Sequence, residues 1–320
     1  MTGFGVFLIV FASVLVIFAV SYILVLINPF KMPLLLKTKI ERVFAIISRV
    51  LIIGLLSLFF ILPLWIVLCA SLSDSVSFIN TGYSIFIQKF SLEGYEYIFK
   101  NPQILKGLGL STLVTVLVTV LSMLINTLAA YALSEKDMPG HKFFNGLFVF
   151  TMLFSTGMVP IVLVIRTIGL YNQFWALVIP AVINVYNILL IRNYIYSIPK
   201  SLKEAAIIDG TGQIRVFFKV ILPVSLPIIA TTGMMAFVLK WNSYLDILYY
   251  IAPDNKDVWT IQYVIMDMLM SFKTNTEEGV MSKYVVQSAT IIITIIPLLC
   301  VFPFVQKYFQ KGLTLGSVKG

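Results

Sequence analysis

The chain has 320 residues, of which 59% are hydrophobic and 12% charged, and its mean hydropathy is +0.98. Soluble globular proteins are far more polar, so this composition excludes a water-soluble domain and indicates an integral membrane protein. The net charge of +9 is explained by basic residues in the connections between spans. We therefore expect no nucleic-acid partner.

Uncharged stretches long enough to cross a bilayer divide the chain. About 20 helical residues, each rising 1.5 Å, cross a hydrocarbon core about 30 Å thick. The stretches are continuously apolar rather than alternating, which favours helices over barrel strands. The sequence therefore predicts an all-α membrane protein with seven transmembrane helices, at 1–30, 50–73, 107–134, 143–165, 167–191, 220–239 and 284–306.

Lysines and arginines in the short connections predict the orientation, because cytoplasmic loops carry an excess of them. Most lie in one set of connections, near 31–49, 136–142, 192–219 and 307–319. This distribution places the N-terminus outside the cell and the C-terminus in the cytoplasm.

The first stretch, 1–30, has no basic segment before it and exceeds the apolar core of a typical signal peptide. We interpret it as a retained extra helix, with a cleaved signal peptide as the alternative. A basic cytoplasmic linker at 31–43, a single six-helix domain at 44–309 and a cytoplasmic tail at 310–320 would follow.

Few residues suggest metal or redox chemistry. Cys69 and Cys300 both lie in predicted spans, which argues against a disulfide framework or a metal cluster. His141 is the only histidine, and we expect a solvated loop residue there.

Two external loops, at about 73–106 and 252–283, are long enough to hold small structured elements. The first contains SLEGYEYIFKNP, whose aromatic residues suit an interfacial helix along the outer headgroups. In the second, methionines within VIMDMLM are expected to pack rather than bind metal.

A polar segment, PKSLKEAAIIDGTGQIRVFFKVILP at 199–223, interrupts the apolar sequence on the predicted cytoplasmic side. Ser201 is followed three residues later by Glu204, which is the spacing of a capping box. We therefore expect a short helix to begin at Ser201 and run through 202–208.

Glycines mark the end of this short helix. Gly210 and Gly212 permit the backbone conformations found at helix ends. Thr211 would cap a second segment at 212–222, which re-enters the membrane at Pro223.

The short helix combines small and apolar side chains. Ala205 and Ala206 would let a partner approach closely, and Leu202, Ile207 and Ile208 could serve as apolar anchors. From these residues alone, a docking surface and a simple connector between two spans are equally good interpretations.

The sequence KEAAIIDGTGQIRVFFKVILP resembles the EAA loop of the membrane subunits of binding-protein-dependent ABC importers. Two other segments, WNSYLDILYY and the tail KYFQKGLTLGSVKG, are similar to the sugar-transporting, maltose-type branch. SLSD at 71–74 resembles the branch that handles oligosaccharides and polysaccharide fragments. The resemblance covers about 44–320, and the extra first helix and Thr211-Gly212, where many relatives have Ala-Ser, depart from it. The matching loop positions are Glu204, Ala205, Ala206, Gly210, Ile221, Leu222 and Pro223.

The resemblance implies a type I ABC importer permease fold, in which the loop helix sits in a cleft of an ATP-hydrolysing subunit. The tail would reach toward the interface of two such subunits, with a frayed end as the alternative. The implied tail residues are Gly312, Gly316 and Lys319. The implied coupling residues are Ser201, Glu204, Ala205, Ala206, Ile208, Asp209 and Gly210.

The ATP source must lie in another chain, because the sequence lacks a GxxxxGK[ST] phosphate loop. We expect no cofactor in this chain and no enzyme activity, with ATP and Mg bound by partner subunits. The implied partners are a second permease subunit in a heterodimer, two ATPase subunits, an extracellular solute-binding protein that meets the 252–283 loop, a sugar and membrane lipid. The implied location is the bacterial cytoplasmic membrane.

Polar groups within spans are costly and suggest a transport path. Amide and carboxylate groups suit sugar hydroxyls, and aromatic faces stack on sugar C–H surfaces. Helix–helix association is the alternative role, and we favour it for each asparagine taken singly. The candidate path residues are Asn184, Asn187, Lys240, Trp241, Asn242, Tyr244 and Asp246.

Lys240 lies near the middle of a helix expected at about 224–251, too deep to reach the headgroups easily. Asp246 would lie about 240° around and about 9 Å along an ideal helix. We therefore expect that Lys240 and Asp246 do not pair.

The sequence thus predicts one permease subunit of an ABC importer for an oligosaccharide or polysaccharide fragment. Another solute class, such as peptide or phosphate, is the nearest alternative. An ion-coupled secondary transporter is less favoured because internal repeats and broken helices are not evident.

Overall fold

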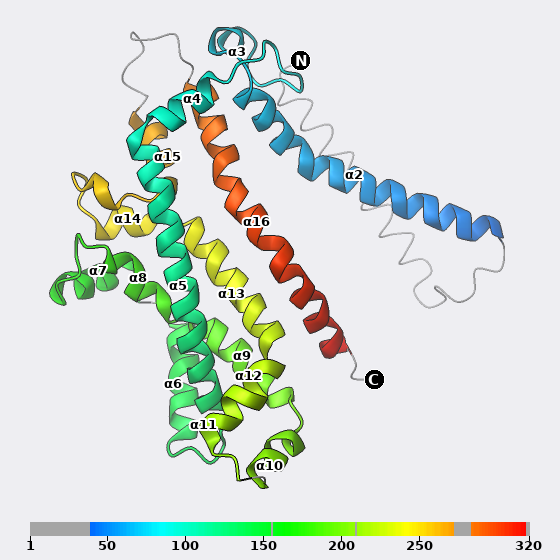
Figure 1. Ribbon diagram of the computed structural model, residues 1–320, viewed down its shortest axis with the longest axis vertical. Helices are drawn as coiled ribbons and strands as arrows, with labels where there is room; N and C mark the ends of the chain where they lie inside the picture. The colour runs from blue at the N-terminus through cyan, green and yellow to red at the C-terminus, as the bar shows by residue number, and fades with distance from the viewer. Residues whose placement is uncertain (1–38, 155, 209, 272–282, 318–320) are drawn as a thin grey trace.

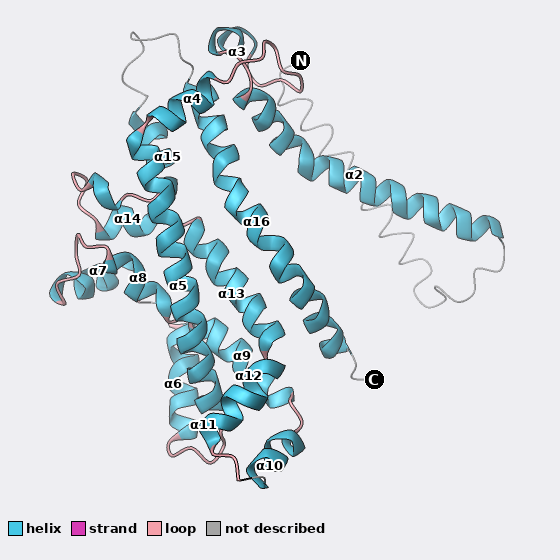
Figure 2. Cartoon of the chain, in the orientation of Figure 1, coloured by secondary structure: helices cyan, strands magenta, loops and turns pink. Residues whose placement is uncertain are grey.

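The structure is a computed structural model that describes residues 39–154, 156–208, 210–271 and 283–317 (Figure 1). The predicted extra helix at 1–30, Asp209 and Lys319 lie outside the described residues. The described part is helical, and its one β interaction is an isolated bridge between Ser73 and Phe90 (Figure 2). The predicted all-α fold is confirmed.

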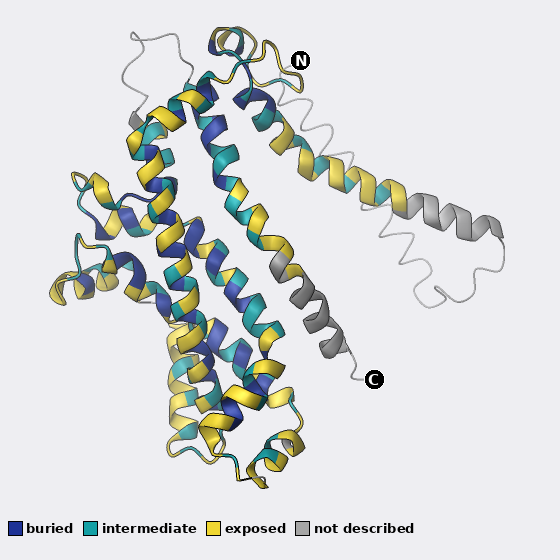
Figure 3. Ribbon diagram, in the orientation of Figure 1, coloured by how far each residue is buried: buried dark blue, intermediate teal, exposed yellow. Residues whose placement is uncertain are grey.

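A central helix organises the body. Helix α5 (Pro102–Ser134) packs against α13 (Leu226–Trp241), α9 (Val185–Ser197) and α8 (Trp175–Val182). Helix α16 (Lys283–Ser317) packs along α13 (Figure 1). Buried residues follow the facing sides of these helices (Figure 3). Helix α5 contacts α8, α9 and α13 and therefore lies at the centre of the body.

The two ends of the bundle carry different short elements (Figure 1). One end holds α3 (Ser75–Thr81) and α4 (Glu93–Lys100), and the opposite end holds α10 (Lys200–Ile208) and α11 (Gln213–Val216). The α10 end contains the predicted cytoplasmic segment. The remaining short elements are η1 (Phe217–Ile221), α12 (Leu222–Val224), α14 (Leu245–Tyr250), η2 (Lys256–Val258) and α15 (Ile261–Ser271).

Helix α2 (Lys39–Ser71) diverges from the bundle and joins it through α16 (Figure 1). Its apolar side chains are largely exposed from Val50 to Trp65 (Figure 3). Such a surface requires lipid or another membrane helix around it. Because α2 begins at Lys39, the end of the predicted linker at 31–43 is helical. The predicted tail at 310–320 likewise belongs to α16 as far as Ser317.

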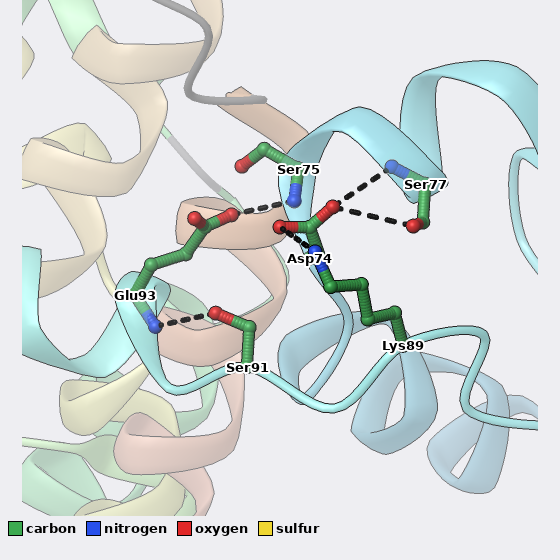
Figure 4. A network of polar contacts seen from close by, with 6 residues as sticks. All are labelled: Asp74, Ser75, Ser77, Lys89, Ser91 and Glu93. Atoms are coloured by element: carbon green, nitrogen blue, oxygen red, sulfur yellow. Dashed lines mark hydrogen bonds and ion pairs between the residues drawn. The ribbon is translucent and has the colours of Figure 1, made fainter.

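Polar contacts fix the loop between α2 and α4 (Figure 4). Asp74 caps α3 by accepting hydrogen bonds from the backbone N–H and hydroxyl of Ser77, each at 3.2 Å. The Ser75 N–H donates to Glu93 Oε1 at 2.5 Å, and Lys89 Nζ lies 3.8 Å from Asp74 Oδ1. The SLSD segment therefore closes this loop onto α4. The helix predicted within SLEGYEYIFKNP is confirmed as α4.

The described residues contain four helices long and apolar enough to span a membrane, or six if two bent pairs each count as one span. The predicted continuous helix at 143–165 is wrong. Helix α6 (His141–Leu153) and α7 (Met158–Thr167) meet at 115°. The C-cap of α6, Phe154, has an extended backbone, and Gly157, with φ 77°, is the N-cap of α7. The span predicted at 167–191 begins later and covers Trp175–Ser197.

The two largest apolar clusters of the described residues pack the body. One includes Val114, Val118 and Trp241, and the other lies nearer α10 and includes Val216 and Phe217. Lipid tails are as apolar as these side chains, so close packing rather than escape from water stabilises the interior of the bundle.

Candidate functional site

Helix α10 forms where the sequence predicts a short cytoplasmic helix, with a different start. It begins at Lys200, directly after Pro199, so Ser201 lies inside the first turn. The predicted capping box, which requires Ser201 as the cap, is therefore wrong. The Leu202 N–H donates to the Pro199 carbonyl at 3.2 Å.

The end of α10 forms a Schellman motif. Gly210 has φ 76°, the Thr211 N–H donates to the Ala206 carbonyl at 3.1 Å, and the Gly210 N–H donates to the Ile207 carbonyl at 2.9 Å. These bonds satisfy carbonyls that the helix end leaves without partners. Gly210 ends the helix as predicted. The predicted Thr211 cap is wrong, because the N-cap of α11 is Gly212, which has no side chain to form a capping bond.

Apolar side chains of α10 are exposed. Ile208 is 85% exposed, and Leu202 and Ile207 are 45% and 46% exposed. Ile207 borders the space between α10 and the end of α5. Ala205 is also exposed, whereas Ala206 is half-buried against the cluster that contains Val216. Apolar exposure on a segment outside the membrane spans is typical of a docking surface. Of the two predicted alanines, Ala205 lies on that surface and Ala206 faces the body.

Side-chain contacts attach α10 to the end of α5. Lys203 forms an ion pair with Glu135, the C-cap residue of α5. A pocket of about 380 Å³ lies between these elements and is lined by Tyr131, Glu135, Lys203 and Glu204, among others. The two elements therefore meet through polar contacts at the margin of an open space.

The chain returns to the body through a bend. Helix α11, the π-helical turn η1 and α12 lead to Ser225, where the axis turns by 76° into α13. Pro227 at the start of α13 fits this geometry, because proline is tolerated in the first turn of a helix. A movement of α10 would reach α13 through this bend.

A second pocket, of about 240 Å³, lies within the body and is hereafter called the path pocket. Its polar lining comes from Ser122, Asn184, Lys240, Ser243 and Asp246. Three candidate path residues, Asn184, Lys240 and Asp246, are therefore brought together from separate elements. Such a lining presents both hydrogen-bond donors and acceptors.

The prediction that Lys240 and Asp246 do not pair is wrong. Lys240 Nζ lies 2.5 Å from Asp246 Oδ2, and the Ser243 hydroxyl donates to the same oxygen at 2.9 Å. The predicted continuous helix at 224–251 is broken, because α13 ends at Trp241 and α14 begins at Leu245. This break brings the carboxylate back over the ammonium, which neutralises a lysine side chain that is only 6% exposed.

The other candidate path residues lie outside the lining of this pocket. Trp241 is 1% exposed, and its indole N–H donates to the Thr294 carbonyl at 3.1 Å. Asn242 bonds back to the Val238 carbonyl, and Tyr244 is the N-cap residue of α14. These contacts give Trp241 a helix-packing role.

Asparagines connect α5 to the break between α8 and α9. Asn184 is the N-cap of α9, and its side chain accepts from the Asn187 N–H at 3.0 Å. The Asn184 N–H donates to Asn126 Oδ1 at 3.3 Å, and Asn126 Nδ2 donates to the Ser122 hydroxyl at 2.7 Å. Ser122, Asn126 and Ser243 are not among the predicted residues. Ser122 and Asn126 form an i, i+4 polar pair within an apolar span, which is a signal that the sequence contains.

His141 begins α6, and its Nε2 lies 3.2 Å from the Tyr196 hydroxyl. The side chain is partly exposed, and the prediction is wrong in one respect, because His141 belongs to a helix rather than a loop. Within the described ranges, no group of three or more His, Cys, Asp or Glu residues could hold a metal ion. Gly312 and Gly316 lie within α16.

Sequence comparisons identify the family. Residues 138–315 match the family described as "Binding-protein-dependent transport system inner membrane component". A Bacillus subtilis polygalacturonan/rhamnogalacturonan transport system permease, YtcP, is 38% identical over 81% of this chain and 93% of its own length. The B. subtilis protein LplC is 35% identical over 88% of this chain and 97% of its own length. An arabinooligosaccharide permease from Halalkalibacterium halodurans, AraQ, is 29% identical over 86% of this chain and 98% of its own length.

A crystal structure of a bacterial ABC transporter that imports the acidic polysaccharide alginate has a similar fold. It superposes with a TM-score of 0.76 and 27% identity, covering 87% of this chain and all of that one. Together with the sequence match, which includes α10 and both bent spans, this agreement supports one assignment. The chain belongs to the family of inner membrane components of binding-protein-dependent transport systems.

Proposed function

We propose that this chain is a permease subunit that imports an oligosaccharide or polysaccharide fragment through a bacterial cytoplasmic membrane. The relatives named for polygalacturonan and rhamnogalacturonan, arabinooligosaccharides and alginate support this substrate class. The observation that carries the transport role is α10, an apolar docking helix at one end of a spanning bundle. The complex would bind ATP and Mg on two partner ATPase subunits.

The coupling role belongs to the outward surface of α10. Leu202 and Ile208 supply apolar contact area, and Ala205 lets a partner surface approach closely. The Schellman motif at Gly210 holds the helix end in place. In this proposal an ATPase subunit receives α10, and Gly312 and Gly316 extend α16 toward the ATPase pair.

The substrate role belongs to the path pocket. The Lys240–Asp246 pair is neutral as a unit, so it offers hydroxyl groups a donor and an acceptor without a net charge. Asn184 adds an amide on the opposite element. A second permease subunit would complete the path, and the exposed face of α2 provides surface for it.

The proposed orientation places α10 in the cytoplasm and α3, α4 and α15 outside, with the N-terminus outside and the C-terminus in the cytoplasm. The external end would meet the solute-binding protein. A solved alginate transporter holds such a periplasmic protein with its bound pentasaccharide. That structure is 15% identical to this chain and supports the fold.

Reconstitution tests the proposal. The chain would be purified from its native membrane with the subunits that it retains, placed in vesicles with its binding protein, and offered oligogalacturonides and arabino-oligosaccharides. We expect ATP-dependent uptake of one of these sugars and co-purification of an ATPase. Uptake without an ATPase, or a stable preparation that binds no ATPase, would contradict the proposal.

A further inference from the structure

We propose that the Glu135–Lys203 ion pair is the link through which movement of α10 reaches the path pocket. The inference rests on the proposed function. Glu135 ends α5, where its backbone N–H donates to the Ala132 carbonyl at 3.2 Å. Lys203 lies in the middle of α10. The pair joins two elements that are 68 residues apart in sequence.

The pair is sheltered compared with most other ion pairs of the described residues. The side chains of Lys203 and Glu135 are 27% and 24% exposed, whereas those of Lys106 and Asp257 are 63% and 84% exposed. Water screens exposed pairs strongly, and a sheltered pair retains more of its attraction. The Glu135–Lys203 pair is therefore suited to transmit force.

The other attachments of α10 are apolar. Its largest helix contacts are with α11 and η1, and Ala206 packs against a cluster that combines η1 residues with Ala130 and Leu133 of α5. The 380 Å³ pocket separates the rest of α10 from the ends of α5 and α9. The ion pair crosses the margin of this opening and reaches α5 directly.

Helix α5 connects this link to the transport path. Ser122 and Val118 of α5 line the path pocket. Ser122 lies 13 residues before Glu135, which is about 20 Å along a continuous helix. A displacement applied at Glu135 would move the pocket wall, while the route through η1 and the Ser225 bend would move α13 and Lys240. The two routes would together move residues of two different elements that line the same pocket.

A staple that merely stabilises the fold is the alternative role. Exchanging the charges of Glu135 and Lys203 distinguishes a transmitting role from a stabilising role, provided that the experiment measures access to the path pocket rather than stability. The variants are Glu135→Lys, Lys203→Glu and the double exchange. Lys136→Glu is the matched control, because Lys136 lines the same 380 Å³ pocket and is not a member of the pair.

The reporter is a cysteine at Ala181, a half-buried lining residue of the path pocket on α8. Cys69 and Cys300 would be replaced by alanine in the parent protein. The assembled complex in vesicles is treated with N-ethylmaleimide, with and without ATP plus vanadate. We expect the nucleotide to change the labelling rate in the parent, and each single exchange to reduce that change roughly fivefold or more. The double exchange should restore it, and Lys136→Glu should leave it intact.

The outcomes are distinct. A nucleotide response that survives both single exchanges overturns the link and leaves the proposed function standing. Equal loss in the single and double exchanges, with assembly intact, also overturns it. If the parent itself shows no response to nucleotide while an ATPase is bound, the proposed function fails. Thermal unfolding of each complex checks the staple role, which would lower stability without altering the nucleotide response.

Discussion

At the residue scale, Gly210 shows how a single backbone conformation positions the docking helix. An added Cβ at Gly210 or at Gly212 would meet no atom within 4 Å, so space does not distinguish the two positions. Their backbones do: Gly210 has φ 76° and Gly212 has φ −65°. Only Gly210 occupies the left-handed region that disfavours other residues.

Substitution at Gly210 should therefore impair coupling, and the same substitution at Gly212 should not. We expect Gly210→Ala to cost about 1 kcal/mol in the local fold of α10, and Gly210→Pro to cost more because proline cannot adopt a positive φ or donate to Ile207. ATP hydrolysis and uptake by the reconstituted complex measure the effect. Equal activity of Gly210→Ala and Gly212→Ala would contradict this role.

The Lys240–Asp246 pair is asymmetric. The lysine side chain is 6% exposed and the aspartate side chain 24%. Removing the carboxylate leaves a buried ammonium without its partner, and removing the ammonium leaves a carboxylate that still accepts from Ser243 and reaches solvent more easily.

Asp246→Asn should therefore destabilise the complex more than Lys240→Met. We expect a loss of about 3 kcal/mol for Asp246→Asn, a smaller loss for Lys240→Met, and partial recovery in the double variant. Thermal unfolding in detergent measures these values as a double-mutant cycle. Lys106→Met, in the exposed pair with Asp257, is the control and should change stability by less than about 0.5 kcal/mol. Additive losses in the cycle would contradict the pair.

At the element scale, the short segment α10 and the long helices differ in how well the sequence predicts them. Span lengths follow from hydropathy, so α2, α5 and α16 lie close to their predicted positions. Hydropathy does not reveal where a helix axis changes direction. The sequence therefore predicts one continuous helix for α6 and α7, and another for α13 and α14. The break at 242–244 leaves no mark in hydropathy, so the contact between Lys240 and Asp246 could not be predicted from it.

The docking residues of α10 show the same limit. The EAA pattern predicts that Ala205 and Ala206 both belong to the docking surface. In the structure Ala205 is exposed, whereas Ala206 is half-buried against the body. The partner of Lys203 could not be predicted, because Glu135 lies on another helix and a predicted helix pattern does not reveal which loop lies beside it. The position of α10 could thus be predicted from the sequence, whereas its exposed and body-facing sides follow only from packing.

A glutamate at each alanine should produce different defects. Ala205→Glu should leave the free energy of unfolding within about 0.5 kcal/mol and abolish association with the ATPase. Ala206→Glu should destabilise the protein by about 1–3 kcal/mol, because the carboxylate is forced against an apolar cluster. Thermal unfolding and ATPase co-purification measure the two effects. Normal ATPase binding by Ala205→Glu would contradict the outward docking face.

At the scale of the whole molecule, the described residues leave two apolar surfaces exposed. The exposed apolar length of α2 suits a membrane environment or the proposed second permease, and the exposed face of α10 suits the proposed ATPase subunit outside the bilayer (Figure 3). The path pocket lies between the two ends of the body. This arrangement suits a subunit that receives mechanical work at one end and opens a passage toward the other.

Crosslinking tests the central claim most directly. A photoreactive residue at Ile208, which is 85% exposed, would be compared with one at Phe86, which is 78% exposed on the loop between α3 and α4. We predict that position 208 captures an ATP-hydrolysing subunit in native membranes and that position 86 does not. Absence of such a product at position 208, in membranes where the assembled complex is active in uptake, would contradict the account.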